Sequence, residues 1–165
     1  MSGAARVRGL WNLVNLSTPL GVAGAVVAGC PLRPGPHGLV QAQGWRNAFP
    51  GGAAFTVGDV VFTRPGLEMT EDLWRHEGAH AAQYALCLGL PFLPLYALAA
   101  AWSTWRTGDP ASRNPFERGA GLVRGGYVQR AVRRGPGRGR VHAALGDRRD
   151  AARAARGAQD PSVRA

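Results

Sequence analysis

The chain has 165 residues, a length typical of one domain with a tail, and it is too short to hold a second large domain. All twenty basic residues are arginines, and with ten acidic residues they give a formal net charge of +10. Nine of the arginines and only three acidic residues lie in residues 131–165, so the positive charge is concentrated there. Apolar residues make up 45% of the chain, which argues against global disorder. Two cysteines are too few for a disulfide framework or a four-cysteine metal site.

The amino-terminal part contains an uncharged stretch over residues 10–29. It ends in Val27-Ala28-Gly29-Cys30, which resembles the lipobox of bacterial lipoproteins, where the cysteine is lipidated during export. Polar residues and a proline interrupt the stretch, so only residues 20–29 form a continuous apolar run. We therefore predict that residues 1–52 are an apolar helix or strand and loops that pack on the core. Lipoprotein export through Cys30 is the alternative.

Short strands are predicted next. Residues 38–42 form an apolar run among turn-forming residues, and residues 54–63 are rich in β-branched and aromatic side chains. The second run predicts a strand that turns or bulges at Gly58-Asp59, because glycine favours such interruptions.

Three helices are predicted after these strands. Thr70 is suited to cap the first, because its hydroxyl can accept a hydrogen bond from a free amide of the first turn, and this helix is expected to end near Leu88. A second helix is expected from about residue 92 to residue 105, and a third from Asn114. Residues 81–105 contain no charged side chain, but two prolines divide them into pieces too short to span a bilayer. We therefore expect two helices in contact rather than a membrane span.

The first of these helices contains the motif His76-Glu77-Gly78-Ala79-His80. Residues four apart lie on one face of a helix, so both imidazoles can bind one metal ion while Glu77 reaches a metal-bound water. The pattern predicts a metal site with His76 and His80 as ligands and Glu77 beside a metal-bound water. The alternative is a pair of exposed or capped helix histidines with an unrelated neighbour. Gly78 costs a helix about 1 kcal/mol relative to alanine, and we expect it to permit close approach of another backbone or a ligand.

The two histidines leave the third ligand open. A metzincin would place a further histidine six residues after His80, but Leu86 stands there, which excludes that class. The downstream candidates are Asp109, Glu117, His142 and Asp147. We favour Glu117, because it lies on a separate predicted helix and completes a set of two histidines and one glutamate. The alternative is a capping role, in which Glu117 bonds to the backbone amide of Asn114.

The order of these features resembles a small zincin-like metallopeptidase domain of the HExxH gluzincin type. It also resembles bacterial zincin-like domains of unknown function that share an HExxHxxQ helix. The resemblance covers residues 53–121, and only the HExxH motif is specific. It implies an α+β fold with a short β-sheet before the HExxH helix, zinc held by His76, His80 and Glu117, and Glu77 as general base.

One departure from the gluzincin pattern concerns the second shell of the metal. Many gluzincins carry an aspartate four residues after the ligand glutamate, and it orients a zinc-bound histidine. That position is Gly121 here, so either Asp72, Asp109 or Asn114 supplies the contact from elsewhere, or the site is weakened. Gln83 shares the helix face of the histidines and is expected to bond either to the site or to another helix. The candidates to stabilise an oxyanion are Tyr96, Tyr127, Arg113 and His142.

The sequence thus predicts a zincin-like core over residues 53–130 and a disordered, arginine-rich tail over residues 131–165. The predicted function is a zinc-dependent hydrolase, a small metallopeptidase whose partner is a peptide or protein substrate. The tail is expected to attract an anionic membrane surface, and because it lacks aromatic residues that stack on bases, no specific nucleic acid is expected. The expected location is cytoplasmic or membrane-peripheral. Two alternatives remain open: a catalytically inactive metal-binding zincin-like protein, and a small membrane-associated protein with a basic tail and no enzymatic activity.

Overall fold

The computed structural model describes residues 2–133 of the chain. The elements of the fold all lie within one compact unit that ends at Ala131. The predicted disordered tail, residues 131–165, lies almost entirely outside the described residues. The described part has the predicted α+β fold, with five α-helices and a four-stranded sheet.

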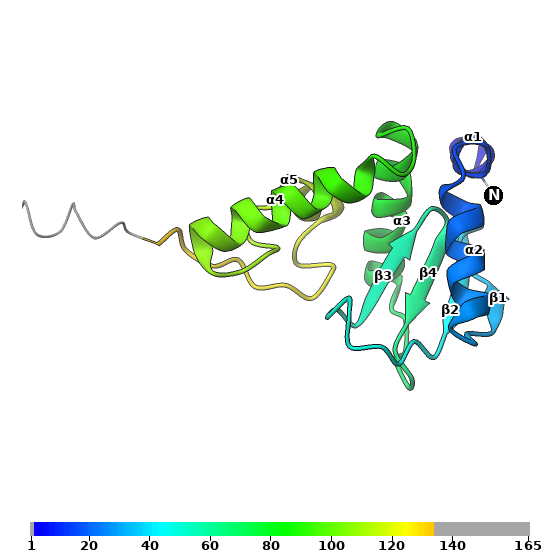
Figure 1. Ribbon diagram of the computed structural model, residues 1–165, viewed down its shortest axis with the longest axis horizontal. Helices are drawn as coiled ribbons and strands as arrows, with labels where there is room; N and C mark the ends of the chain where they lie inside the picture. The colour runs from blue at the N-terminus through cyan, green and yellow to red at the C-terminus, as the bar shows by residue number, and fades with distance from the viewer. Residues whose placement is uncertain (1, 134–165) are drawn as a thin grey trace, which may run out of the picture. The chain divides into compact units, whose positions relative to one another are not determined.

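The elements follow one another with short connections (Figure 1). They are α1 (Gly3–Val14), α2 (Ser17–Val27), β1 (Leu32–Pro34), the 3-10 turn η1 (Pro36–Gly38), β2 (Val40–Gln43), β3 (Ala54–Val57), β4 (Val60–Thr63), α3 (Glu71–Leu86), α4 (Phe92–Thr107) and α5 (Pro115–Ala120). The single strand expected over residues 54–63 is a hairpin of β3 and β4. Gly58 turns the chain there with a φ of 61°, and a Cβ atom at this position would lie 2.3 Å from the backbone nitrogen of Thr18.

The sheet has the strand order β1-β2-β4-β3 and is mixed. The inner strands β2 and β4 are parallel, with Val40 opposite Val60, and both outer pairs are antiparallel. Side chains alternate between the two faces of a strand. Val60 and Phe62 therefore pack with Ala25 of α2 on one face, whereas Val61 packs with Trp74 and Ala81 of α3 on the other. The sheet positions α3, the helix that carries the HExxH motif.

The ends of α3 follow from local bonding. The Thr70 hydroxyl accepts a hydrogen bond from the amide of Leu73 at 3.2 Å, as predicted for the cap. The helix ends at Leu86, two residues earlier than expected, because Leu88 and Gly89 adopt left-handed φ values of 60° and 91°. The amide of Gly89 then donates to the carbonyl oxygen of Tyr84 at 2.7 Å, and α4 starts in a new direction.

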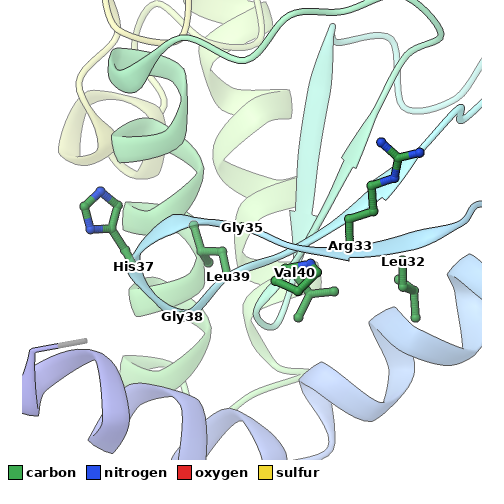
Figure 2. A pocket seen from close by; sticks show the side chains of 8 residues that line it. Leu32, Arg33, Gly35, His37, Gly38, Leu39 and Val40 are labelled. Atoms are coloured by element: carbon green, nitrogen blue, oxygen red, sulfur yellow. The ribbon is translucent and has the colours of Figure 1, made fainter.

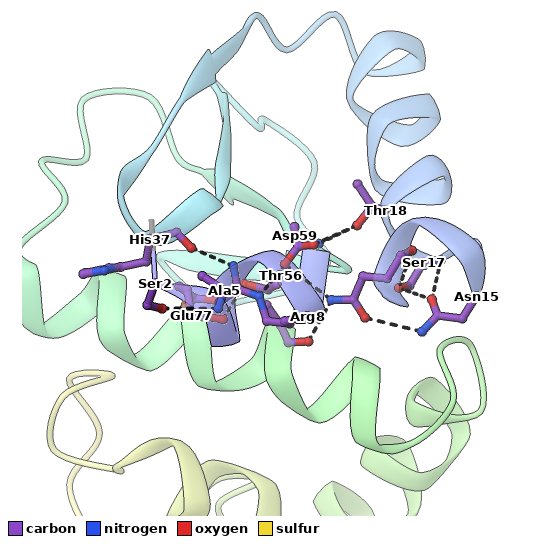
Figure 3. A network of polar contacts seen from close by, with 12 residues as sticks. Ser2, Ala5, Arg8, Asn15, Ser17, Thr18, His37, Thr56, Asp59 and Glu77 are labelled. Atoms are coloured by element: carbon purple, nitrogen blue, oxygen red, sulfur yellow. Dashed lines mark hydrogen bonds and ion pairs between the residues drawn. The ribbon is translucent and has the colours of Figure 1, made fainter. Parts of the chain in front are cut away.

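A polar network holds α1 against the β3–β4 turn and α3 (Figure 3). The buried carboxylate of Asp59 accepts a hydrogen bond from Arg8 Nε at 2.7 Å. The fully buried amide of Asn12 donates to the carbonyl oxygen of Ala81 at 2.9 Å. The polar side of α1 thus faces the protein and its large apolar side chains face outward. The apolar run predicted to pack on the core lies mainly in α2, where Ala25 is buried in the core cluster and Val22 packs against it.

Within residues 2–133, no single helix has both the length and the apolar composition needed to cross a bilayer. Helices α1 and α2 meet those criteria only as a pair, and they are bent by 73° with respect to each other.

Candidate metal centre

Three side chains from two helices converge in the interior. His76 and His80 lie on one face of α3, and Glu117 lies on α5. The two Nε2 atoms are 3.2 Å apart, His76 Nε2 lies 3.4 Å from Glu117 Oε2, and His80 Nε2 lies 3.6 Å from Glu117 Oε1. All three residues are buried. Glu117 is therefore placed where the sequence predicts a third ligand.

The spacing of these atoms fits a tetrahedral metal ion. Bonds of about 2.0–2.2 Å to a tetrahedral zinc ion separate neighbouring ligand atoms by roughly 3.3–3.6 Å. The three measured separations are 3.2, 3.4 and 3.6 Å. Glu117 Oε2 is also buried without a hydrogen-bond partner among the described residues. A buried carboxylate oxygen without a donor is costly, and a cation at this point would satisfy it.

The other ring nitrogen of each histidine faces an acceptor. Gln83 donates from Nε2 to the carbonyl oxygen of Phe116 at 2.9 Å, and this bond turns its Oε1 toward His80 Nδ1 at 2.8 Å. His76 Nδ1 lies 3.2 Å from the carbonyl oxygen of Gly121. A neutral histidine with its proton on Nδ1 presents a lone pair at Nε2. With this tautomer, the two Nε2 lone pairs and the Glu117 carboxylate would together form the ligand set of a cation.

The electrostatics of the cluster also favour positive charge. Burial alone would raise the pKa of Glu117, but contacts with His76 and His80 outweigh it and hold this pKa well below its ordinary value. Burial likewise opposes protonation of His80, yet the Glu117 carboxylate raises the pKa of His80 above its ordinary value. The site thus keeps a buried carboxylate ionised beside two imidazoles.

Glu77 lies beside this cluster and is not one of its three converging groups. Its side chain is buried, and Thr56 Oγ1 of β3 donates a 2.6 Å hydrogen bond to Glu77 Oε2. Burial raises the pKa of Glu77 above its ordinary value. The positive charge of protonated His80 and the hydrogen bond from Thr56 lower this pKa, but by less than burial raises it. Glu77 thus has the burial and the fixed carboxylate that a general base requires.

Glu117 does not make the alternative capping bond. The side chain of Asn114 caps α5 by accepting a hydrogen bond from the amide of Phe116 at 3.0 Å, and the amide of Asn114 donates to Ala111 at 3.1 Å. The carboxylate of Glu117 instead accepts a hydrogen bond from the hydroxyl of Tyr96 and contacts the two histidines. Glu117 does not cap the helix because the amide of Asn114 already donates its hydrogen bond to Ala111.

None of the three residues expected in the second shell contacts His76. Its Nδ1 atom is held by the backbone of Gly121 and not by Asp72, Asp109 or Asn114. Asp72 is exposed in the first turn of α3, and Asp109 accepts hydrogen bonds from the amide and hydroxyl of Ser112 at 2.7 and 2.6 Å. The residue that replaces the gluzincin aspartate thus makes the contact through its main chain.

The expectation for Gly78 is also wrong, because close approach occurs at a different glycine. A Cβ atom at Gly78 would meet only Leu39 Cδ1, at an ordinary contact distance of 3.6 Å. A Cβ atom at Gly125, by contrast, would lie 2.5 Å from His76 Cε1. The segment after α5 therefore packs its backbone directly on the ring of His76.

The oxyanion candidates lie at different distances from the cluster. Tyr96 is bonded to Glu117, and the ring centroid of Tyr127 lies 6.0 Å from that of His76. Arg113 is partly buried, with its Nε atom lacking a hydrogen-bond partner among residues 2–133. His142 and Asp147 lie outside the described residues. Sequence reasoning did not identify Thr56 or Gly125, since neither stands in a recognisable motif.

A shallow pocket of about 430 Å³ lies elsewhere, over the β1–β2 turn, and is lined by residues from Leu32 to Val40 (Figure 2). It contains none of the metal-centre residues. No protein-family model matches the chain, and neither a curated protein nor a solved structure matches it.

Proposed function

We propose that the protein is a zinc-dependent hydrolase, and more narrowly a small zincin-like metallopeptidase. The observation that carries this proposal is the convergence of His76, His80 and Glu117 at separations of 3.2–3.6 Å beside the buried carboxylate of Glu77. Two neutral imidazoles and one carboxylate form the ligand set of many catalytic zinc sites, which keep a fourth position for water.

A zinc ion held by these three side chains would supply Lewis-acid chemistry, polarising a peptide carbonyl and acidifying a water molecule. Glu77 then acts as the general base: its carboxylate accepts the proton of the attacking water and passes it to the departing amine nitrogen. The hydrogen bond from Thr56 to Glu77 Oε2 fixes the carboxylate during this transfer. Gln83 and Gly121 orient the two imidazoles through Nδ1.

The experiment compares Glu77→Gln with the parent on a peptide library whose cleavage is read by mass spectrometry. The amide keeps the size of the side chain but cannot accept the proton, so cleavage should fall by at least about 10²-fold while zinc content stays the same. Glu68→Gln is the matched control, because Glu68 is exposed in the loop before α3. Full activity of Glu77→Gln on a peptide that the parent cleaves would contradict the proposal.

A second candidate function is a metal-binding protein without catalysis. Burial favours it: His76 and Glu117 are each only 2% exposed, and the backbone at Gly125 covers His76. A peptide reaches the ion only if this segment moves. A parent protein that binds zinc through the three ligands and cleaves no peptide in the library would support this second function and contradict the first.

A further inference from the structure

Helix α1 is amphipathic in the opposite sense to a helix on the surface of a water-soluble domain. Val7, Leu10 and Val14 lie on one stripe and are 70%, 65% and 64% exposed. The opposite side is polar and turned inward, with Asn12 fully buried and Arg8 paired with Asp59. A helix on a water-facing surface normally presents its charged and polar residues outward.

The apolar stripe of α1 continues onto the end of α3. Trp11 Nε1 donates a 3.0 Å hydrogen bond to the carbonyl oxygen of Ala85, and Gly89 packs against Asn15. Figure 1 shows α1 beside that end of α3. Leu86 and Leu88, 81% and 67% exposed, lie next to this contact. We call the surface made by Val7, Leu10, Trp11, Val14, Leu86 and Leu88 the apolar face.

Helix α4, which starts just beyond the apolar face, has the same inverted character. Leu95, Leu98 and Trp105 are exposed at helical spacing, with exposures of 46%, 69% and 71%. Ser103 and Thr107 are buried on the inner side. Phe92 is also buried on the inner side of α4, so what the two helices share is a row of exposed apolar side chains, and this row indicates an apolar environment outside the protein.

The charges around the apolar face have one sign. Helices α1, α2 and α4 contain no acidic residue, and their only charged residues are Arg6, Arg8 and Arg106. The exposed acidic residues nearest in sequence, Glu71 and Asp72, lie in the first turn of α3, at the opposite end of that helix from Leu86. Arg8 is paired with Asp59 on the inner side, so Arg6 is the basic residue of α1 that lies beside the exposed apolar side chains, and a basic residue in that place suits the surface of an anionic bilayer.

We propose that the apolar face docks on an anionic phospholipid bilayer, with α1 lying between the headgroups and the acyl chains. Twelve helical residues extend about 18 Å along the surface. Trp11 lies at the level where tryptophan is favoured, between water and hydrocarbon. Arg6, the exposed arginine of α1, meets the lipid phosphates, whereas Arg8 stays paired with Asp59 on the inner side. This proposal is independent of the metal centre and of any hydrolytic activity.

The test measures co-flotation of the full chain with vesicles of equal parts phosphatidylcholine and phosphatidylglycerol, at low and at high salt. The variant is Val7→Ser/Leu10→Ser/Val14→Ser, whose side chains are exposed and whose loss leaves the polar network intact. The matched control is Phe49→Ser/Val123→Ser/Val128→Ser, because these residues are at least as exposed but lie on loops away from α1. Circular dichroism checks that each variant is folded.

We expect the parent and the control to bind at both salt concentrations, and the α1 variant to bind at least about tenfold more weakly, because apolar insertion is not screened by salt. If the variant unfolds, quenching of parent tryptophan fluorescence by brominated lipid gives a second readout, and quenching is expected. Absence of parent binding, or equal binding by the α1 variant, would overturn the proposal. So would a parent that forms a dimer through α1 and ignores vesicles, since a second copy would then cover the face.

Discussion

The Nδ1 atom of His76 lies 3.2 Å from the backbone carbonyl oxygen of Gly121, four residues after Glu117. A main-chain acceptor can orient a metal-binding imidazole as a carboxylate does, but it adds no full negative charge. The position of this carbonyl depends on the unusual backbone of Gly121, with φ 90° and ψ 91°. This conformation strongly favours glycine.

Gly121→Ala should therefore weaken metal binding by roughly 10–100-fold, the range expected when a partner of a metal ligand is lost. A side chain at this φ strains the backbone and moves the carbonyl away from His76. Gly126→Ala is the control, because Gly126 also has a positive φ of 77° but has nothing within 4 Å of a Cβ atom. Zinc affinity measured by competition with a chelator separates the two variants, and equal affinities would refute the role of Gly121.

Gln83 makes a second link between the metal centre and α5. It accepts from His80 through Oε1 and donates to Phe116 through Nε2. Gln83→Leu removes both bonds, so we expect roughly 10–100-fold weaker zinc binding and a lower melting temperature. Gln41→Leu, which removes a 3.2 Å bond from Gln41 to Thr63 outside the metal centre, should leave zinc affinity unchanged. Titration calorimetry on both variants tests this difference.

The proposed hydrolysis is expected to have a pH profile that depends on Thr56. Glu77 accepts a proton only when it is ionised, so activity is present above its pKa and lost as the pH falls through it. Burial raises this pKa, and the hydrogen bond from Thr56 lowers it. Thr56→Val should therefore move the acid limb of kcat/KM to higher pH. Thr63→Val, on the neighbouring strand, should not move it, and an acid limb unchanged in Thr56→Val would contradict the assignment of Glu77.

The parts of the fold that the sequence predicts are those set by local chemistry. The cap at Thr70, the turn at Gly58 and the start of α5 at Asn114 depend on residues within a few positions of one another. The HExxH spacing places two imidazoles on one face because helical periodicity alone requires it. The place of Glu117 beside the two histidines could be predicted from its residue type and its position on a separate helix. Its hydrogen bond with Tyr96 could not be predicted.

The second shell could not be predicted for two physical reasons. Every residue has a backbone carbonyl, so nothing in the sequence marks that of Gly121 as an acceptor for His76. Thr56 reaches Glu77 only because β3 and α3 pack together, across 21 positions of sequence. The periodicity of α1 predicts a polar side and an apolar side. Which of them faces inward depends on Asp59, a residue of a distant turn that pairs with Arg8.

The pair of Arg8 and Asp59 should contribute strongly to stability. Their nitrogen and oxygen atoms are 2.7 Å apart, and the side chains are 13% and 5% exposed. Asp59→Asn leaves the arginine without its counter-charge, which costs about 3–5 kcal/mol for a buried pair. Glu71→Gln, which breaks an exposed pair with Arg75, should leave the urea midpoint nearly unchanged, because solvent screens such a pair. Urea unfolding of both variants tests the contrast, and equal midpoints would contradict it.

The metal content of the purified protein, measured by mass spectrometry of the elements, tests the central claim most directly. We predict one tightly bound zinc ion per chain, retained in His37→Ala, whose imidazole is half exposed beside Glu71. The double variant His76→Ala/His80→Ala should lose the ion, and Glu117→Gln should bind it more weakly because a charged ligand is removed. The claim that these three side chains bind zinc would be contradicted by a parent protein that holds no metal after purification and zinc addition. A double variant that keeps stoichiometric zinc would contradict it as well.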